Sequence, residues 1–96
     1  MDSEHKRIQS TVHGRVQGVG FRYFVLDNAK RLNLTGWTRN RFNRTVEVVA
    51  EGENENLLQF LQVLRKGHRS SQVKNVDHAW QAATGEFENF RIRMTR

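Results

Sequence analysis

The sequence predicts a domain of the α+β class, and three observations support this prediction. Several short segments alternate apolar and polar residues, which is typical of strands with one buried face. Two longer segments instead carry apolar residues at the spacing of one helical face. Glycine and asparagine separate these segments, because the 96 residues include no proline.

The first strand is expected over residues 8–13, where Ile8 and Val12 fall on the same face. Residues 1–6 are polar and carry no such pattern. We therefore expect a flexible N-terminal tail over residues 1–6 and a single domain over residues 7–96.

Three glycines follow the first strand within a short segment. After them, the spacing of the apolar residues changes from that of a strand to that of a helix. From Phe21 onward, apolar residues recur on one helical face, and Asn33 and Gly36 are the expected stop signals of this helix. A second extended segment is expected over residues 34–40. It leads through a turn to the clearest strand, residues 45–51, so the two segments are expected to form a hairpin.

The second helix is expected over residues 53–66, where apolar residues recur at i, i+3, i+4 and i+7 and Gly67 provides a stop. Two further strands are expected over residues 73–80 and 90–94. The order is therefore β-α-β-β-α-β, which is the split β-α-β or ferredoxin-like arrangement. In this α/β sandwich, two helices pack on one face of a mostly antiparallel sheet.

The composition excludes several kinds of site and partner. The chain has no cysteine, which excludes disulfides, thiolate nucleophiles and cysteine-bound zinc. No apolar run is long enough to span a membrane, and the polar N-terminus does not fit a secretory signal, so we expect a cytoplasmic protein. The net charge of +6 favours anionic ligands, but it does not distinguish nucleic acid, an acidic membrane or a small phosphate compound.

Residues 14–22, GRVQGVGFR, leave the first strand and open the first helix. Glycines allow positive φ, so successive backbone amides in this segment can point inward and form an anion-binding nest. The helix start adds unpaired N–H groups, and Arg22 adds a guanidinium that can bind a phosphate through two hydrogen bonds. A tight strand-to-helix turn with a surface arginine is the alternative. The segment fits neither a Walker loop nor a dinucleotide-binding fingerprint.

Three segments of the chain resemble the acylphosphatase family. Residues 14–22 resemble its first signature, residues 36–40, GWTRN, resemble its second, and residues 46–52, VEVVAEG, resemble the strand that follows. The similarity extends over residues 8–94, which is nearly the whole chain. The fold of that family is the ferredoxin-like sandwich, so the resemblance and the periodicity predict the same architecture.

The resemblance implies hydrolysis of acyl phosphates to a carboxylate and inorganic phosphate, with no metal, cofactor or covalent intermediate. The family's catalytic arginine and asparagine fall on Arg22 and Asn40. Its phosphate-binding amides fall on the loop that consists of Arg15, Val16, Gln17, Gly18, Val19 and Gly20. Inorganic phosphate is then expected as a product or competitive inhibitor. We expect a monomer with no nucleic-acid or membrane partner.

These residue types suit phosphoryl transfer, in which a protein mainly positions groups and stabilises charge. A carboxylate leaving group has a conjugate acid with a pKa of about 4, so it departs without a general acid. The side-chain amide of Asn40 can both accept and donate hydrogen bonds, which suits it to orient the attacking water. Because an amide does not titrate near neutrality, we expect the proton of the water to pass to a phosphate oxygen of the substrate.

The chain departs from the usual family pattern at three places. The turn over residues 42–44 reads FNR, where the family commonly has Asp-Gly, so its geometry is expected to differ. His68 stands where proline is usual, which is expected to loosen that loop, and Met94 stands where an aromatic residue is common. None of these departures falls on the two expected catalytic positions.

Two other functions fit parts of the sequence. RNA-recognition domains share the element order and the basic charge, and residues 19–24, VGFRYF, weakly resemble one of their motifs. That motif belongs on a central strand, however, whereas these residues open a helix and the strand over residues 45–51 has no aromatic residue. A non-catalytic member of the acylphosphatase fold is the second alternative, although both catalytic positions are filled. The four histidines show no metal-ligand spacing.

Overall fold

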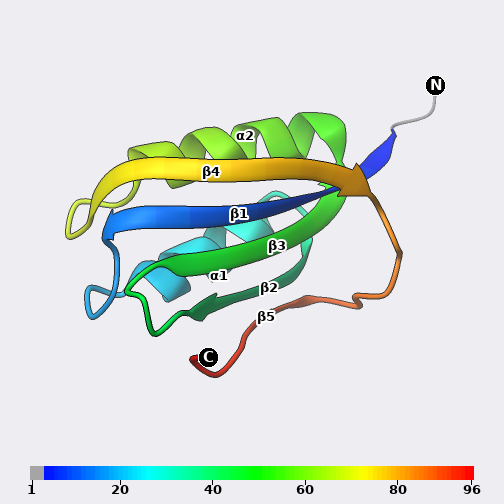
Figure 1. Ribbon diagram of the computed structural model, residues 1–96. Coiled ribbons are helices and arrows are strands. Elements are labelled where there is room, and N and C mark those ends of the chain that lie inside the picture. The colour runs from blue at the N-terminus through cyan, green and yellow to red at the C-terminus, as the bar shows by residue number, and fades with distance from the viewer. Residues whose placement is uncertain (1–3) are drawn as a thin grey trace.

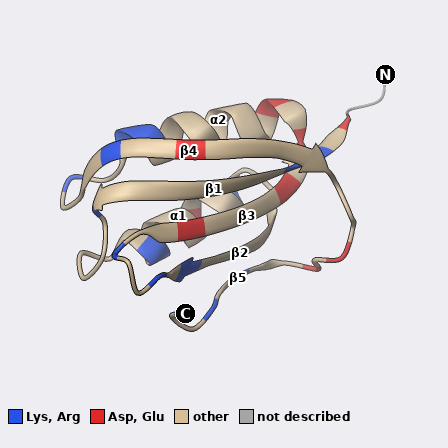
Figure 2. Ribbon diagram, in the orientation of Figure 1, with Lys and Arg blue, Asp and Glu red and all other residues tan. Residues whose placement is uncertain are grey.

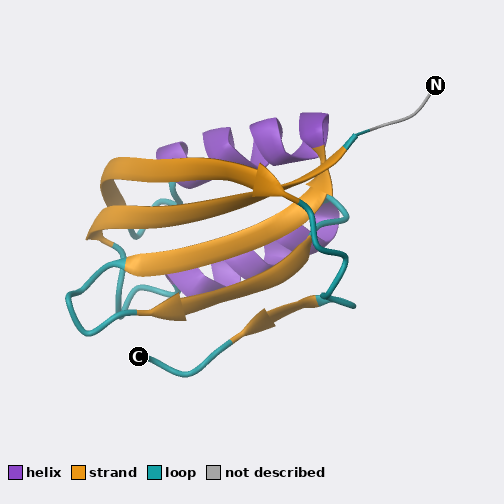
Figure 3. Cartoon of the chain, turned by 45° about the vertical axis from the view of Figure 1, so that its right-hand side comes forward, coloured by secondary structure: helices purple, strands orange, loops and turns teal. Residues whose placement is uncertain are grey.

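The computed structural model describes residues 4–96. Its elements in chain order are β1 (His5–Arg15), α1 (Phe21–Arg31), β2 (Thr35–Asn40), β3 (Val46–Glu53), α2 (Asn54–Lys66), β4 (Gln72–Ala82) and β5 (Phe90–Ile92). The strands form one sheet in the order β4-β1-β3-β2-β5 (Figure 1). β5 pairs with β2 in parallel, whereas the other neighbours pair antiparallel. Both helices lie on one face of the sheet, which confirms the predicted ferredoxin-like α+β fold (Figure 3).

β1 begins earlier than the periodicity predicts. His5 and Lys6 both pair with β3, and Lys6 also pairs with β4. The prediction of a flexible tail over residues 1–6 is therefore wrong for its last two positions, while residues 1–3 lie outside the described part of the chain. Backbone pairing with neighbouring strands holds these polar residues in place, and such pairing leaves no apolar pattern in the sequence.

Of the two residues expected to end α1, Asn33 does so and Gly36 does not. Asn33 has a φ of 56°, and the Leu34 amide donates to the Ala29 carbonyl at 2.9 Å, which closes the last turn. Gly36 lies within β2 instead, with a φ of 138°. A Cβ atom on Gly36 would clash with the carbonyl oxygen of Val49 on β3, so only glycine permits this close strand pairing. The prediction of Gly36 as a helix stop is therefore wrong.

The core lies between the sheet and the two helices. β1 and β3 contribute fully buried residues such as Ile8, Val12 and Val48, and the helices add Phe21 and Phe60. Each large apolar side chain buried in this way contributes about 1.5–3 kcal/mol relative to an exposed one. This layer fixes the strand ends and helix starts from which the loops leave.

In the described part of the chain, no helix covers the other face of the sheet (Figure 3). Trp37 is 8% exposed, and the guanidinium groups of Arg39 and Arg93 each lie 4.7 Å from the centre of its ring. Arg39 also forms an ion pair with Glu47 at 2.9 Å. The arginine side chains thus shield an aromatic ring that would otherwise meet water.

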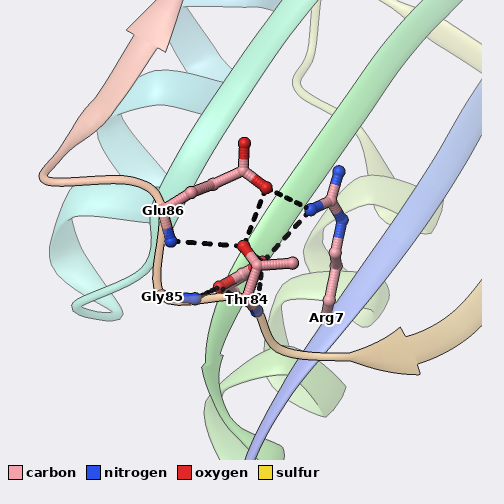
Figure 4. A network of polar contacts seen from close by, with 5 residues as sticks. Arg7, Thr84, Gly85 and Glu86 are labelled. Carbon is pink, nitrogen blue, oxygen red and sulfur yellow. Dashed lines mark hydrogen bonds and ion pairs between the residues drawn. The ribbon is translucent and has the colours of Figure 1, made fainter.

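Glu51 fixes the connection between β4 and β5. Its buried carboxylate accepts hydrogen bonds from the amides of Thr84 and Gly85 at 3.0 and 2.9 Å, and from the Thr84 hydroxyl at 2.8 Å (Figure 4). Arg7 pairs with this carboxylate at 3.3 Å and with Glu86 at 3.0 Å. Burial alone would raise the pKa of Glu51, but two backbone amides, a hydroxyl and a guanidinium together hold it below its usual value.

Glu51→Gln is expected to lower the free energy of unfolding by about 2 kcal/mol at neutral pH, because the donors around the carboxylate lose a charged acceptor. The pKa of Glu51 is lower in the folded state than in the unfolded chain. Its contribution is therefore fully present above the unfolded value of 4.5 and is lost as the pH falls through the folded value. Urea denaturation of wild type and variant at neutral and acidic pH checks both points.

The matched control for this test is Glu88→Gln, which neutralises an exposed carboxylate in the same connection. This control should unfold at nearly the same urea concentration as the wild type. An equal loss of stability in both variants, or a difference between Glu51→Gln and wild type that does not shrink in acid, would contradict the function assigned to Glu51.

Candidate active site

Three connections lie at one end of the domain, and the expected site residues lie among them. The β1–α1 loop, the β2–β3 turn and the α2–β4 connection are all at the left-hand end of the sheet in Figure 1. Arg15 ends β1, and the loop carries residues 16–20. α1 opens with Phe21 and Arg22, and β2 ends at Asn40 just before the turn. The fold therefore brings all the residues named from the sequence to the same end.

The β1–α1 loop is anchored by two valine side chains. Val16 is buried at 1% exposure, and Val19 packs against the core. Gly18 and Gly20 have φ values of 73° and 79°, which residues with a Cβ atom rarely adopt. No residue of the described chain accepts a hydrogen bond from the backbone amides of residues 16–20. Fixed, unpaired amides are what an anion-binding nest requires.

The start of α1 offers further unpaired N–H groups. Gly20 occupies the cap position without a side-chain cap, and the first turn contains no acidic residue. The positive end of the helix dipole is therefore not neutralised locally. Arg22 lies in this turn with a half-buried side chain, and it forms no ion pair with any residue from 4 to 96. Together these groups favour a bound anion.

Gln17 joins the loop to the β2–β3 turn. Its side-chain nitrogen donates to the Arg41 carbonyl at 2.8 Å and to the Thr45 carbonyl at 2.9 Å. Arg41 directly follows Asn40, so these bonds fix the loop relative to the end of β2. Sequence reasoning assigned only the backbone amide of Gln17 to the site and missed this contact of its side chain. No local pattern signals it, because the acceptors are backbone atoms 24 and 28 residues away.

Asn40 ends β2 with its side chain on the helix-covered face. It pairs with the buried Val46 of β3, and the side chains of directly paired residues share one face of a sheet. Its backbone carbonyl accepts a hydrogen bond from the Arg96 amide at 3.1 Å. Its side-chain oxygen, Oδ1, is buried and has no hydrogen-bond partner among the described residues. Such a buried acceptor is costly, which favours a bound ligand or water at this position.

His68 packs against the start of α1. Its ring centre lies 6.0 Å from that of Phe21 and 5.2 Å from that of Phe24. Its Nδ1 accepts a hydrogen bond from the Ser70 amide at 3.0 Å, and its backbone carbonyl accepts one from the Ser71 hydroxyl at 2.8 Å. The His68 side chain thus joins the α2–β4 connection to the first turn of α1.

The two segments that carry the candidate site residues are cationic and contain no carboxylate or imidazole, although the His68 ring packs against the start of α1. Residues 15–23 and 40–45 include four arginines but no Asp, Glu or His. Over residues 4–96, no group of three His, Asp or Glu side chains is placed to hold a metal ion. No helix in that range is long and apolar enough to cross a membrane.

The sequence is similar to those of several proteins with a shared name. The sequence model of the Acylphosphatase family matches residues 8–92. The chain is 42% identical to an acylphosphatase of Salinibacter ruber over 88 residues, which cover 92% of this chain and 93% of that protein. It is 49% identical to an acylphosphatase of Bacillus licheniformis over 81 residues, which cover 84% of this chain and 90% of that protein.

The fold is similar to the same group of proteins. The crystal structure of acylphosphatase from Bacillus subtilis matches with a TM-score of 0.89 and 35% sequence identity, over 92% of this chain and 98% of that one. The range matched by the family model includes the β1–α1 loop, Arg22 and Asn40. The chain therefore belongs to the acylphosphatase family, which is a family of enzymes.

Proposed function

We propose that the protein is an acylphosphatase, which hydrolyses the carboxyl–phosphate bond of acyl phosphates to a carboxylate and inorganic phosphate. Membership of the family supports this activity. The observation that carries the proposal is the buried Oδ1 atom of Asn40, which has no partner among the described residues. Asn40 directly precedes the β2–β3 turn, and Gln17 fixes the β1–α1 loop to this turn. An unpartnered acceptor for water at the same end of the sheet as a set of unpaired amides fits hydrolysis better than it fits anion binding alone.

In the proposed complex, the amides of residues 15–20 and the guanidinium of Arg22 hold the oxygens of the phosphate. Val16 and Val19 keep the loop in place, so these donors are arranged before the substrate binds. Arg22 can donate two parallel hydrogen bonds to one phosphate, which the ammonium of a lysine does not. As charge redistributes over the phosphate oxygens in the transition state, the same donors stabilise it.

The attacking water is proposed to donate a hydrogen bond to Oδ1 of Asn40, which orients it in line with the phosphorus and the leaving carboxylate. The amide does not titrate near neutrality, so the proton of the water passes to a phosphate oxygen. The carboxylate leaves without a general acid, because its conjugate acid has a pKa of about 4. This route fits a site whose residues 15–23 and 40–45 contain no carboxylate or imidazole.

All the groups that the proposal uses belong to one chain, in the β1–α1 loop, α1 and β2. No step requires a metal, a cofactor or a second subunit, in keeping with the monomer expected from the sequence. The proposed substrate is a small acyl phosphate. Inorganic phosphate would bind to the same donors as a product and competitive inhibitor.

Arg22→Ala is expected to weaken the binding of phosphate. The KM for benzoyl phosphate and the inhibition constant of inorganic phosphate should both rise by about 10- to 100-fold, because two charge-assisted hydrogen bonds are lost. Initial rates of benzoyl phosphate hydrolysis in EDTA, with and without added phosphate, measure both constants. Arg31→Ala, at the other end of α1, is the matched control. A folded wild type that releases no phosphate would refute the proposed activity itself.

Asn40→Ala is expected to lower kcat by about 100- to 1,000-fold, which is the scale of losing one preorganised hydrogen-bonding group. The inhibition constant of phosphate should change little, because Arg22 and the loop amides remain. Asn56→Ala, in α2, is the control. The kcat of the wild type should also stay level between about pH 6 and pH 8. A steep limb in that range would contradict the proposed transfer of the proton to the substrate.

Gln17→Ala is expected to loosen the loop without removing a group that contacts the substrate. The two carbonyls of the β2–β3 turn lose their donor, which should lower the free energy of unfolding by about 1–2 kcal/mol. The displaced loop amides should lower kcat/KM for benzoyl phosphate by about tenfold. Gln17→Glu lacks the N–H donors and should show the same losses, whereas Gln81→Ala on β4 should not. Full activity in both Gln17 variants would mean that the loop keeps its position without these bonds.

A further inference from the structure

The α2–β4 connection packs against the start of α1 through the side chain of His68. The ring centre of His68 lies 6.0 Å from that of Phe21 and 5.2 Å from that of Phe24, and the two phenylalanine rings lie 5.6 Å apart. Gly67 follows α2 with a φ of 69°, and a Cβ atom there would lie 3.9 Å from Cε1 of Phe21. Three aromatic rings from two segments therefore form one cluster at the first turn of α1, which carries Arg22.

Hydrogen bonds fix the orientation of His68 within the connection. Its Nδ1 accepts a hydrogen bond from the Ser70 amide at 3.0 Å, so the ring carries its proton on Nε2 and has no charge. Its own amide donates to the Ser71 hydroxyl at 3.0 Å, and this hydroxyl donates to the His68 carbonyl at 2.8 Å. The connection therefore presents the ring to α1 in a fixed orientation.

Packing alone does not explain why a histidine occupies this position. Its Nε2 is buried and has no hydrogen-bond partner among residues 4–96, which is costly for a polar atom. A phenylalanine would avoid this cost, but it could not accept the hydrogen bond from the Ser70 amide. An asparagine could accept that bond, but it has no ring to place on Phe21 and Phe24. Of these three residue types, only histidine supplies both the acceptor and the ring.

An uncharged ring suits this contact, because both segments are basic. Residues 65–74, which include the end of α2 and the connection, contain four Lys or Arg residues and no acidic residue. Figure 2 shows this charge in blue at the end of α2 and on the connection. Residues 20–26 contain Arg22 and no acidic residue. No ion pair can therefore join the two segments, and their like charges favour separation unless the aromatic contact holds them together.

We propose that His68 is a positioning residue for the phosphate. By packing on Phe21 and Phe24, its ring keeps the first turn of α1 in place, and with it Arg22 and the unpaired amides at the helix start. Buried and hydrogen-bonded side chains fix the loop that precedes this turn, whereas His68 fixes the turn itself. This inference rests on the phosphate site of the proposed function and adds a residue from a third segment to it.

The test measures the binding of inorganic phosphate by isothermal titration calorimetry, together with the kinetics of benzoyl phosphate hydrolysis. His68→Asn keeps the acceptor for the Ser70 amide and removes the ring, whereas His68→Phe keeps the ring and removes the acceptor. His68→Asn should raise the Kd of phosphate and the KM by about three- to tenfold, because the phosphate donors are less well preorganised. Its kcat should stay close to that of the wild type, because Asn40 lies on β2. His68→Phe should bind phosphate as the wild type does.

His78→Asn is the matched control, since it removes an exposed histidine that contacts Trp80 on β4, outside the site. Its Kd for phosphate should equal that of the wild type. Normal phosphate binding by folded His68→Asn would overturn the inference, and so would an equal loss of affinity in His68→Phe. If circular dichroism shows that His68→Asn does not fold, Phe24→Leu removes a ring on the other side of the contact, and an unchanged Kd there refutes the inference.

The two readouts separate this inference from the proposed function. A folded wild type that binds phosphate but does not hydrolyse benzoyl phosphate would refute the proposed activity, while the phosphate titrations would still decide whether His68 positions the anion. A folded wild type that does not bind phosphate would refute both.

Discussion

The backbone amides of the β1–α1 loop must stay unpaired while the loop stays fixed, and the rest of the site depends on this requirement. Loops are commonly fixed by pairing their amides, but pairing here would remove the donors that an anion needs. Side chains hold the loop instead. Val16 is buried in the core, and Gln17 is bonded to two carbonyls of the β2–β3 turn. Gly18 and Gly20 allow the backbone to turn between these anchors and the helix. An exposed run of N–H groups can therefore be rigid before any ligand binds.

The position of Asn40 depends on the sheet in a similar way. Its backbone lies between β3, where it pairs with Val46, and the C-terminal segment, whose Arg96 amide donates to its carbonyl. That segment follows β5, which reaches β2 only after the connection that Glu51 holds through the amides of Thr84 and Gly85. One buried carboxylate thus supports the last strand, and the last strand supports the end of β2. The side chain of Asn40 is presented from a backbone that is fixed on both sides.

Local patterns predicted the fold, because strands and helices depend on spacing along the chain. The candidate site residues were instead named from the resemblance to a family, and the fold brings them to one end of the sheet. Alternation predicted the strands, helical spacing predicted the helices, and the glycines predicted a loop with positive φ. The missed features are contacts between a side chain and atoms that are distant in sequence. Gln17 bonds to the β2–β3 turn, Glu51 bonds to residues more than 30 positions later, and His68 packs on Phe21. Such contacts depend on the assembled fold and leave no period in the sequence.

The position of the acidic residues matters more for ligand binding than the net charge of +6 does. On the uncovered face of the sheet, Arg7 and Arg39 each lie within 3.3 Å of a glutamate, so their fields are largely cancelled at a short distance. Near the β1–α1 loop, Arg41 pairs with Glu47 at 3.1 Å. Arg15, Arg22 and Arg44 form no ion pair with any residue from 4 to 96, so their fields add to those of the unpaired amides. A nest of amides alone would suit one small anion. A nest flanked by unpaired cations attracts an anion more strongly, and this difference depends on which cations are paired and not on how many there are.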